Sequence, residues 1–143
     1  MAKLENSYKL TLRNDLKELT TLAAKLEEIS ELFELGAKMT FQINLCLDEL
    51  ITNTISYGYN DKSEHLINID FNLDGNKLTI KLIDDGKSFN PLEHEIVSLD
   101  TPLEEKPIGG LGIHFVREMT DSLEYTRIDN NNILTLRKTI ERE

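Results

Sequence analysis

The chain has 143 residues, of which 29% are charged, and a formal net charge of −10. This length allows one domain with a substantial core, while the acidic balance argues against binding nucleic acid through its phosphates. The sequence has no long apolar run, which excludes a membrane-spanning helix, and its start lacks the apolar stretch of a signal peptide. The single cysteine, Cys46, cannot form an internal disulfide, so we expect a cytoplasmic protein.

The first part of the sequence predicts one strand followed by two helices. Residues 9–12 are the candidate strand, and Asp15 and Glu18 then have the spacing of a helix-capping box. Apolar residues recur at spacings of three and four, which indicates an amphipathic helix: Leu16, Leu19, Ala23, Leu26, Ile29 and Phe33. We expect Gly36 to end this helix. A second helix should span about residues 40–57.

The middle of the sequence predicts a β-hairpin and then a lid. Apolar and polar residues alternate over residues 67–73 and again over 78–82, the pattern of half-buried strands. Asp74-Gly75 between them is a hairpin turn pair. Residues 87–108 show no clear period and contain all three prolines. A segment of this length in a compact domain is typical of a lid over a binding site.

A short helix and a second hairpin complete the predicted elements. Gly109-Gly110-Leu111-Gly112 opens the helix, and the hairpin joins residues 123–127 to residues 133–136 across 129–132. No repeat, low-complexity run or linker divides the sequence, so we expect a single domain over residues 1–143. This order of elements favours an α/β (α+β) two-layer sandwich with the helices on one face of a mostly antiparallel, mixed sheet.

The second predicted helix has a polar stripe with little charge. At about 100° per residue, one side of the helix carries Gln42, Cys46, Glu49, Asn53 and Ser56. Only Glu49 is charged, so we interpret the stripe as facing a cleft, the alternative being a solvated face with short side chains. We expect Cys46 to be a small buried residue.

Glu49 and Asn53 are candidates for phosphoryl-transfer chemistry. They lie four residues apart, so their side chains meet on one face of a helix. A carboxylate can take a proton from a hydroxyl or orient a water molecule. An amide oxygen is a hard ligand suited to Mg²⁺. Together the two side chains make half of such a site.

Two stretches containing glycine are further candidates for a binding site. Asp84 follows a predicted strand and can hydrogen-bond a buried ligand, and Gly86 lets a ligand approach the backbone. An ordinary turn is the alternative reading. Glycines just before a helix, as at residues 109–112, expose backbone N–H groups that bind phosphate; a hinge is the alternative. The spacing matches neither a Walker A motif nor a dinucleotide-binding motif.

Three phrases of the sequence together resemble a known family. DELITNTISYGY, DDGKSFNP and GGLGIHFVREMTD contain, in order, Glu49-x-x-x-Asn53, Asp84-x-Gly86 and Gly110-Leu111-Gly112. These resemble the asparagine box and the two glycine boxes of the GHKL ATPases, over roughly residues 38–138. The size is most similar to the anti-sigma-factor serine kinase branch of that family.

The sequence departs from the family pattern at three positions, none of which removes a catalytic group. Ser88 stands where a second glycine is usual, and Ile108 stands where the second glycine box often begins. Tyr57 occupies a place where this branch often has histidine.

The resemblance implies the Bergerat fold, with ATP and Mg²⁺ as cofactors, and a role for each matched residue. Glu49 would be the general base that activates the attacking hydroxyl, and Asn53 would ligate the Mg²⁺ held by the ATP phosphates. Asp84 would accept a hydrogen bond from the adenine amino group, with Gly86 letting the adenine lie close. The hydroxyl of Thr135 would support the adenine site. The phosphate-binding turn would comprise Gly109, Gly110, Leu111 and Gly112.

The function implied by the resemblance is a serine/threonine kinase that regulates a small partner protein. Its implied partners are an anti-anti-sigma-like phosphoacceptor and a sigma factor, with a homodimer as a further option and no contact with nucleic acid or membrane. The alternative is a module that binds ATP and sequesters a partner without transferring phosphate. Glu49 favours the kinase, because a pure binder does not need a base. Histidine kinases and topoisomerase-type ATPases fit less well, since both need additional domains.

Overall fold

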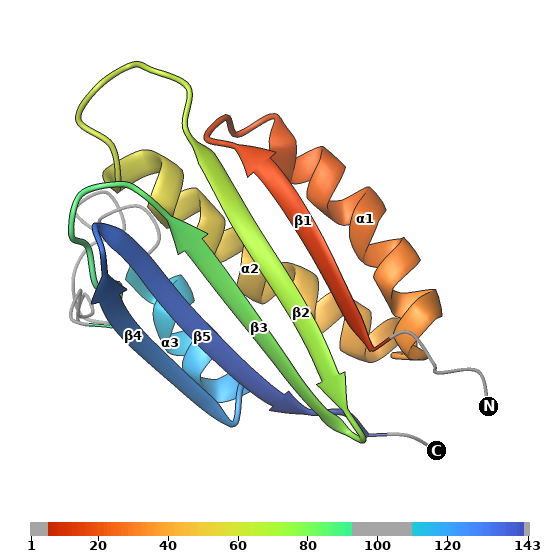
Figure 1. The fold of residues 1–143 in the computed structure, drawn as a ribbon. Helices are drawn as coiled ribbons and strands as arrows, with labels where there is room; N and C mark the ends of the chain where they lie inside the picture. Colours follow the sequence, from red (N-terminus) through yellow and green to blue (C-terminus); the bar gives the residue numbers. More distant parts are fainter. Residues whose placement is uncertain (1–5, 93–109, 142–143) are drawn as a thin grey trace.

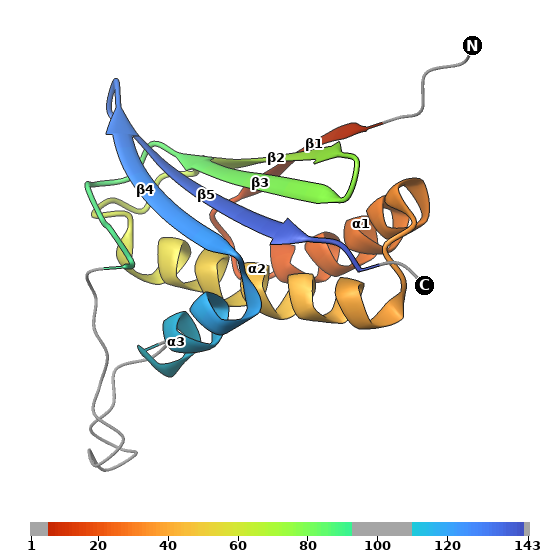
Figure 2. The same cartoon turned by 90° about the horizontal axis from the view of Figure 1, so that it is seen from below.

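The structure, a computed structural model, describes residues 6–92 and 110–141. In this part of the chain, a five-stranded sheet carries three helices on one face, so that the molecule has two layers (Figures 1 and 2). The two-layer α+β class expected from the sequence is therefore confirmed, although the sheet is antiparallel rather than mixed. None of the helices in residues 6–92 and 110–141 combines the length and the apolar character needed to cross a bilayer.

The elements follow the predicted order along the chain. The helices are α1 (Glu18–Phe33), α2 (Ala37–Tyr57) and α3 (Gly110–Met119). The strands are β1 (Ser7–Arg13), β2 (Leu66–Asp74), β3 (Lys77–Asp84), β4 (Ser122–Ile128) and β5 (Asn131–Thr139). In space the strands lie in the order β1-β2-β3-β5-β4, and all four neighbouring pairs are antiparallel. The end of β3 therefore lies beside the start of β5, although α3 and β4 separate them in the sequence.

The first helix begins later than predicted. Leu16 precedes α1 and is 50% exposed. The chain turns at this point because Asp15 Oδ1 accepts a hydrogen bond from the backbone N–H of Lys17, 3.0 Å away, and Glu18 accepts one from the N–H of Arg13 at 2.9 Å. The apolar face that packs on the sheet consists of Leu22, Leu26, Ile29 and Phe33.

The expectation that Gly36 ends the first helix is wrong. Glu34 takes the left-handed conformation at the end of α1, with φ of 56°, and its N–H donates to the carbonyl of Ser30. Gly36, with φ of 81°, directly precedes α2, which starts at Ala37. The connection between the helices is so short that two consecutive sharp turns are needed, and the glycine serves the second of them.

Both hairpins form, but the second turn is shorter than predicted. Gly75 has φ of 62° in the β2–β3 turn. In the β4–β5 turn, Asp129 and Asn130 have φ of 52° and 67°, values that aspartate and asparagine tolerate better than most residues. Asn131 and Asn132 consequently belong to β5 rather than to the turn.

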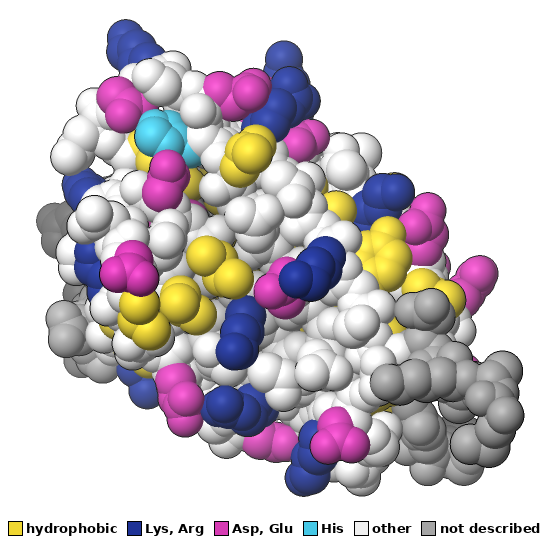
Figure 3. All heavy atoms as spheres, in the orientation of Figure 1, with side chains coloured by type: hydrophobic (Ala, Val, Ile, Leu, Met, Phe, Trp, Pro, Cys, Tyr) yellow, Lys and Arg dark blue, Asp and Glu magenta, His cyan; other side chains and the backbone are white. Residues whose placement is uncertain are grey.

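The two faces of the sheet differ in character. The core lies between the sheet and the helices, where the alternate residues of β2 are buried: Ile67, Ile69, Phe71 and Leu73. The opposite face is open, and Figure 3 shows it with positive and negative side chains intermixed. A few apolar side chains are exposed in the structure, among them Leu66 at 50% and Ile128 at 52%.

Candidate functional site

The polar stripe on α2 brings Glu49 and Asn53 into direct contact. Asn53 Nδ2 donates a hydrogen bond to Glu49 Oε2 at 3.0 Å. Asn53 is only 4% exposed, whereas Glu49 is partly exposed. Burial raises the pKa of the Glu49 carboxyl, and the bond from Asn53 opposes this effect to a smaller extent. The bond uses one N–H of the amide NH₂ group and leaves the amide oxygen of Asn53 as an acceptor or a metal ligand.

The start of α3 packs directly against Glu49. A Cβ atom added at Gly112 would lie 1.9 Å from Cδ and 2.1 Å from Oε1 of Glu49, so only glycine leaves room for this carboxyl. Gly110 and Leu111 form the beginning of the same helix, while Gly109 lies outside the described residues. The first N–H groups of a helix have no partner within that helix, and those at the start of α3 lie at the end near the acidic side chain, the end that favours phosphate.

A second group of residues gathers where β3 ends. Asp84 is 8% exposed, and its Oδ1 accepts a hydrogen bond from the Gly86 N–H at 2.9 Å. A Cβ at Gly86 would lie 2.4 Å from the carbonyl oxygen of Gly58, at the end of α2. Burial raises the pKa of Asp84 more than its hydrogen bonds from Asn132 and Gly86 lower it. We expected Gly86 to let a ligand approach the backbone; in the structure the close neighbour of Gly86 is the backbone of Gly58.

A small cavity adjoins Asp84. Its volume is about 20 Å³, and Phe89, Pro91 and Asn132 are among the residues that line it. This space suits one water molecule, whereas sites for small molecules measure about 300–1,000 Å³. Phe89 and Pro91 belong to the predicted lid, of which residues 93–108 lie outside the described part. A nucleotide base next to Asp84 would thus require Phe89 and Pro91 to move.

Asn132, which the sequence did not single out, is a member of this group. It is 5% exposed, and its Nδ2 donates to Asp84 Oδ1 at 3.0 Å. Thr135 lies three residues along the same strand, so its side chain points to the other face of the sheet. There it pairs with Lys81 and Glu124. We expected the hydroxyl of Thr135 to support the adenine site, but Thr135 lies on the opposite face of the sheet. Asn132 is the residue of β5 that lies next to Asp84.

Cys46 is buried, as expected, although it lies on the polar stripe. It is 1% exposed, and burial raises its thiol pKa to about 11. A thiol of this kind stays protonated near neutral pH and is not a nucleophile. The titratable chemistry of the stripe therefore rests on Glu49.

The described residues contain no group of three or more His, Cys, Asp or Glu side chains that could hold a metal ion. A Mg²⁺ ion would therefore need most of its ligands from elsewhere. Such an ion is commonly held by one or two protein oxygens, water and the phosphates of a nucleotide. The amide oxygen of Asn53 fits the role of a single protein ligand of this type.

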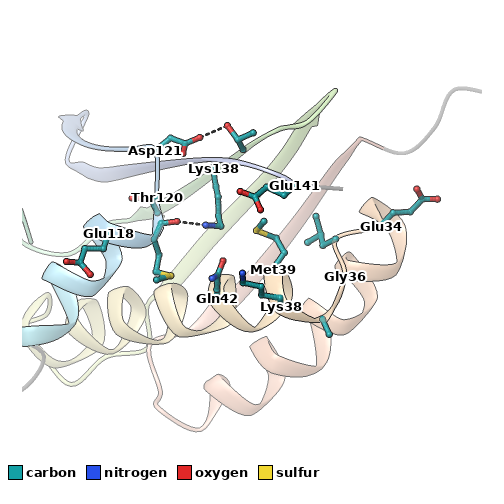
Figure 4. A pocket seen from close by; sticks show the side chains of 14 residues that line it. Glu34, Gly36, Lys38, Met39, Gln42, Glu118, Thr120, Asp121, Lys138 and Glu141 are labelled. Atoms are coloured by element: carbon teal, nitrogen blue, oxygen red, sulfur yellow. Dashed lines mark hydrogen bonds between the residues drawn. The ribbon is translucent and has the colours of Figure 1, made fainter. Parts of the chain in front are cut away.

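A larger hollow lies away from both groups. It has a volume of about 930 Å³ and lies between the start of α2, the end of α3 and the end of β5 (Figure 4). Some of its polar side chains already bond to the protein: Lys138 donates to the Met119 carbonyl, and Thr139 donates to Asp121 at 2.6 Å. Neither Glu49 nor Asp84 reaches it, so we locate the functional site by its chemistry rather than by its volume.

The fold and the grouping of residues define an ATPase domain of the GHKL class. A helix carries an acidic residue and an asparagine, a glycine-containing helix start packs against the acid, and a buried aspartate ends a central strand. The sequence model of the histidine kinase-like ATPase domain matches residues 12–138. The chain belongs to this family.

The chain is similar to several proteins of known name. The chain is 26% identical over 111 residues to the serine/threonine-protein kinase BtrW of Bordetella bronchiseptica. The matched segment covers 78% of each protein. It is 34% identical over 82 residues to an anti-sigma F factor of a Thermoanaerobacter species and spans 57% of that protein. In fold, 97% of the chain matches a structure of the RsbU and RsbW domains of Rv1364c from Mycobacterium tuberculosis, with a TM-score of 0.69 and 16% identity, over only 34% of that chain.

Proposed function

We propose that residues 1–143 form a single ATP-binding domain, a GHKL-type serine/threonine kinase that uses ATP and Mg²⁺ to phosphorylate a small regulatory partner. The observation that carries this proposal is the contact between Glu49, Asn53 and Gly112. It combines a base, a metal ligand and a helix start suited to phosphate within one small region.

Glu49 is the proposed general base. In the reaction, the partner's hydroxyl loses its proton to the carboxylate as its oxygen bonds to the γ-phosphorus, and ADP leaves. A base works best when its pKa lies close to the working pH. Burial raises the pKa of Glu49 in this direction. A site that only held ATP would have no use for such a group.

The other residues of the site would bind the nucleotide. Mg²⁺, held by Asn53 and by phosphate oxygens, would neutralise charge on the phosphates. The start of α3, with Gly110, Leu111 and Gly112, would donate backbone N–H groups to them, and we keep Gly109 in this turn as part of the proposal. Asp84 would accept a hydrogen bond from the adenine amino group, through its Oδ2 atom. Among the described residues, the hydrogen bonds of Asp84 all use Oδ1, which leaves Oδ2 for this purpose.

The proposed partner is an anti-anti-sigma-like phosphoacceptor, and the chain would act in the cytoplasm as an anti-sigma-like factor. The name of the Thermoanaerobacter relative supports a sigma factor as a second ligand, and the name of the Bordetella relative supports a serine or threonine as the acceptor. A homodimer is part of the proposal. An ATP-dependent module that sequesters its partner without phosphotransfer is the competing function.

Two substitutions on α2 test the mechanism. Glu49→Gln keeps the shape of the side chain but removes the base, so ATP binding should persist while phosphotransfer falls by about 10²–10⁴-fold. Asn53→Ala removes the proposed metal ligand, so binding of Mg-ATP and transfer should fall together. The measurements are nucleotide titration and single-turnover transfer from labelled ATP to candidate partners. Unchanged transfer by Glu49→Gln would exclude the proposed base. Binding of ATP and partner without any transfer by the parent protein would establish the sequestration module instead.

A further inference from the structure

We propose that Asn132 is a positioning residue that makes the site selective for adenine, by presenting Asp84 to the base as an oriented hydrogen-bond acceptor. The inference rests on the proposed function, because it concerns how Asp84 recognises a nucleotide. Asn132 itself need not touch the ligand.

The side chain of Asn132 joins two groups of opposite hydrogen-bonding character. On one side its Nδ2 atom lies 3.0 Å from Asp84 Oδ1, 2.9 Å from the carbonyl oxygen of Lys87 and 3.5 Å from that of Gly86. All three atoms are acceptors. Because only an N–H group can face them, they fix the orientation of the amide.

The other side of the amide faces donors. Arg127 Nη1 donates to Asn132 Oδ1 at 2.9 Å, and the Tyr125 hydroxyl donates to the same atom. Arg127 Nη1 also donates to the carbonyl of Gly86 at 3.1 Å. The side chain of residue 132 must therefore donate on one side and accept on the other, a requirement that an amide meets and a carboxylate or an apolar group does not.

This network determines how Asp84 is presented to a ligand. Oδ1 is occupied by Asn132 and by the Gly86 N–H, so the carboxyl cannot rotate freely and Oδ2 is the atom left for the base. Adenine offers an amino group to such an acceptor, whereas guanine offers a carbonyl oxygen, which would require a donor. Asp84 selects adenine only while it is ionised, because a protonated carboxyl can donate to guanine.

The charges around Asp84 are balanced so that this ionisation depends on the network. Burial raises the pKa of Asp84, and so does neighbouring Asp85; the bonds from Asn132 and Gly86 lower it, and Arg127 lowers it further. Tyr59, in the loop after α2, also faces Asp84; its own pKa is raised, mainly by burial. Removing the donor on Asn132 therefore favours the protonated form of Asp84.

The test is the ratio of ATP to GTP affinity as a function of pH. In this ratio the titration of the nucleotide phosphates cancels. Asn132→Asp keeps the size of the side chain but places a second carboxylate against Asp84, so that the pair should hold a proton to higher pH. We expect the preference for ATP to fall by about 10-fold or more at neutral pH. The pH below which the preference disappears should also rise.

A matched control is available one residue away. Asn131→Asp makes the same change of charge, but this side chain lies on the open face of the sheet and should leave the ratio unaltered. Arg127→Met provides a second test at a less buried position, should Asn132→Asp fail to fold by circular dichroism. It should reduce the ATP preference in the same direction, with Arg137→Met, on the open face, as its control.

The possible results separate the two proposals. A loss of ATP preference in Asn132→Asp and Arg127→Met but not in the controls supports the positioning role. Equal weakening of ATP and GTP, or no change in the ratio, overturns it, because a purely structural residue affects both nucleotides alike. If the parent protein shows no preference for ATP, the proposed function of Asp84 fails as well, whatever the variants do.

Discussion

Substitution of Gly112 by alanine should separate catalysis from folding. The added Cβ would lie 1.9 Å from Cδ of Glu49, whereas ordinary contacts between carbon atoms are about 3.5–4.0 Å. The atoms in conflict belong to the end of a flexible side chain rather than to the backbone, so Glu49 can rotate away by about 1.5 Å or more. That movement breaks its 3.0 Å hydrogen bond with Asn53 and removes the base from its position.

The magnitudes predict a small effect of Gly112→Ala on stability and a large effect on the rate of phosphotransfer. Alanine is favoured over glycine within a helix by up to about 1 kcal/mol, and the lost hydrogen bond costs about 0.5–1.5 kcal/mol. The free energy of unfolding should therefore change by less than about 1 kcal/mol. Misplacement of a catalytic group by about 1 Å can reduce a rate 100-fold, and complete loss of the base reduces it by about 10²–10⁴-fold.

The assay combines urea unfolding, ATP titration and single-turnover phosphotransfer. Gly112→Ala should remain folded and bind ATP, but transfer phosphate as slowly as Glu49→Gln. The double variant provides the control: if both changes act through the same carboxylate, it should be no slower than either single variant. Transfer at the parent rate by Gly112→Ala, or additive losses in the double variant, would show that the contact between Gly112 and Glu49 does not position the base.

Three further predictions concern the end of β3 and the loop before β2. Asp84→Asn should fold but bind ATP about 10- to 100-fold more weakly, because a donor replaces the acceptor; calorimetry with ATP and GTP measures this. Gly86→Ala should destabilise the protein in urea unfolding, since its Cβ would lie 2.4 Å from the backbone oxygen of Gly58, which cannot rotate away. The pKa of His65 is raised, mainly by its hydrogen bond with Asp61. The contribution of protonated His65 to the free energy of unfolding should be complete below pH about 6.5 and disappear as the pH rises through the native pKa. The substitution His65→Gln should therefore cost more stability at pH 6 than at pH 9.

Hydrophobic periodicity predicted most of the fold because each element has one buried face. The alternation in β2 and β3 and the spacing of Leu26, Ile29 and Phe33 record which side packs on the core. Positions at the ends of elements were less predictable. Gly36 was read as the end of α1, yet Glu34 adopts the left-handed conformation there, because the geometry of a short connection depends on how both helices pack.

Contacts within the candidate site were predictable where residues close in the sequence are also close in space. Glu49 and Asn53 meet because a helix places residues four apart together. Asn132 was missed because its partners, Asp84 and Lys87, are far away in the sequence and depend on the pairing of β3 with β5. Its place in a run of three asparagines after an aspartate also resembled a turn. Only the pairing of β3 with β5 brings Asn132 next to Asp84, and no local sequence pattern specifies that pairing.

The structure also gives a reason for the absence of lysine and arginine between Met39 and Asp61. A cation on the stripe next to Glu49 would form an ion pair and lower the pKa of this carboxyl, which burial now raises. An ion pair with a lysine there would make the Glu49 carboxylate a weaker base. The lysine would also compete with the attacking hydroxyl for contact with this carboxylate. In the proposed mechanism, the positive charge that the phosphates require comes instead from Mg²⁺ and from the N–H groups at the start of α3, neither of which pairs permanently with Glu49. An uncharged stripe with a single acid is therefore what a general base on this helix needs.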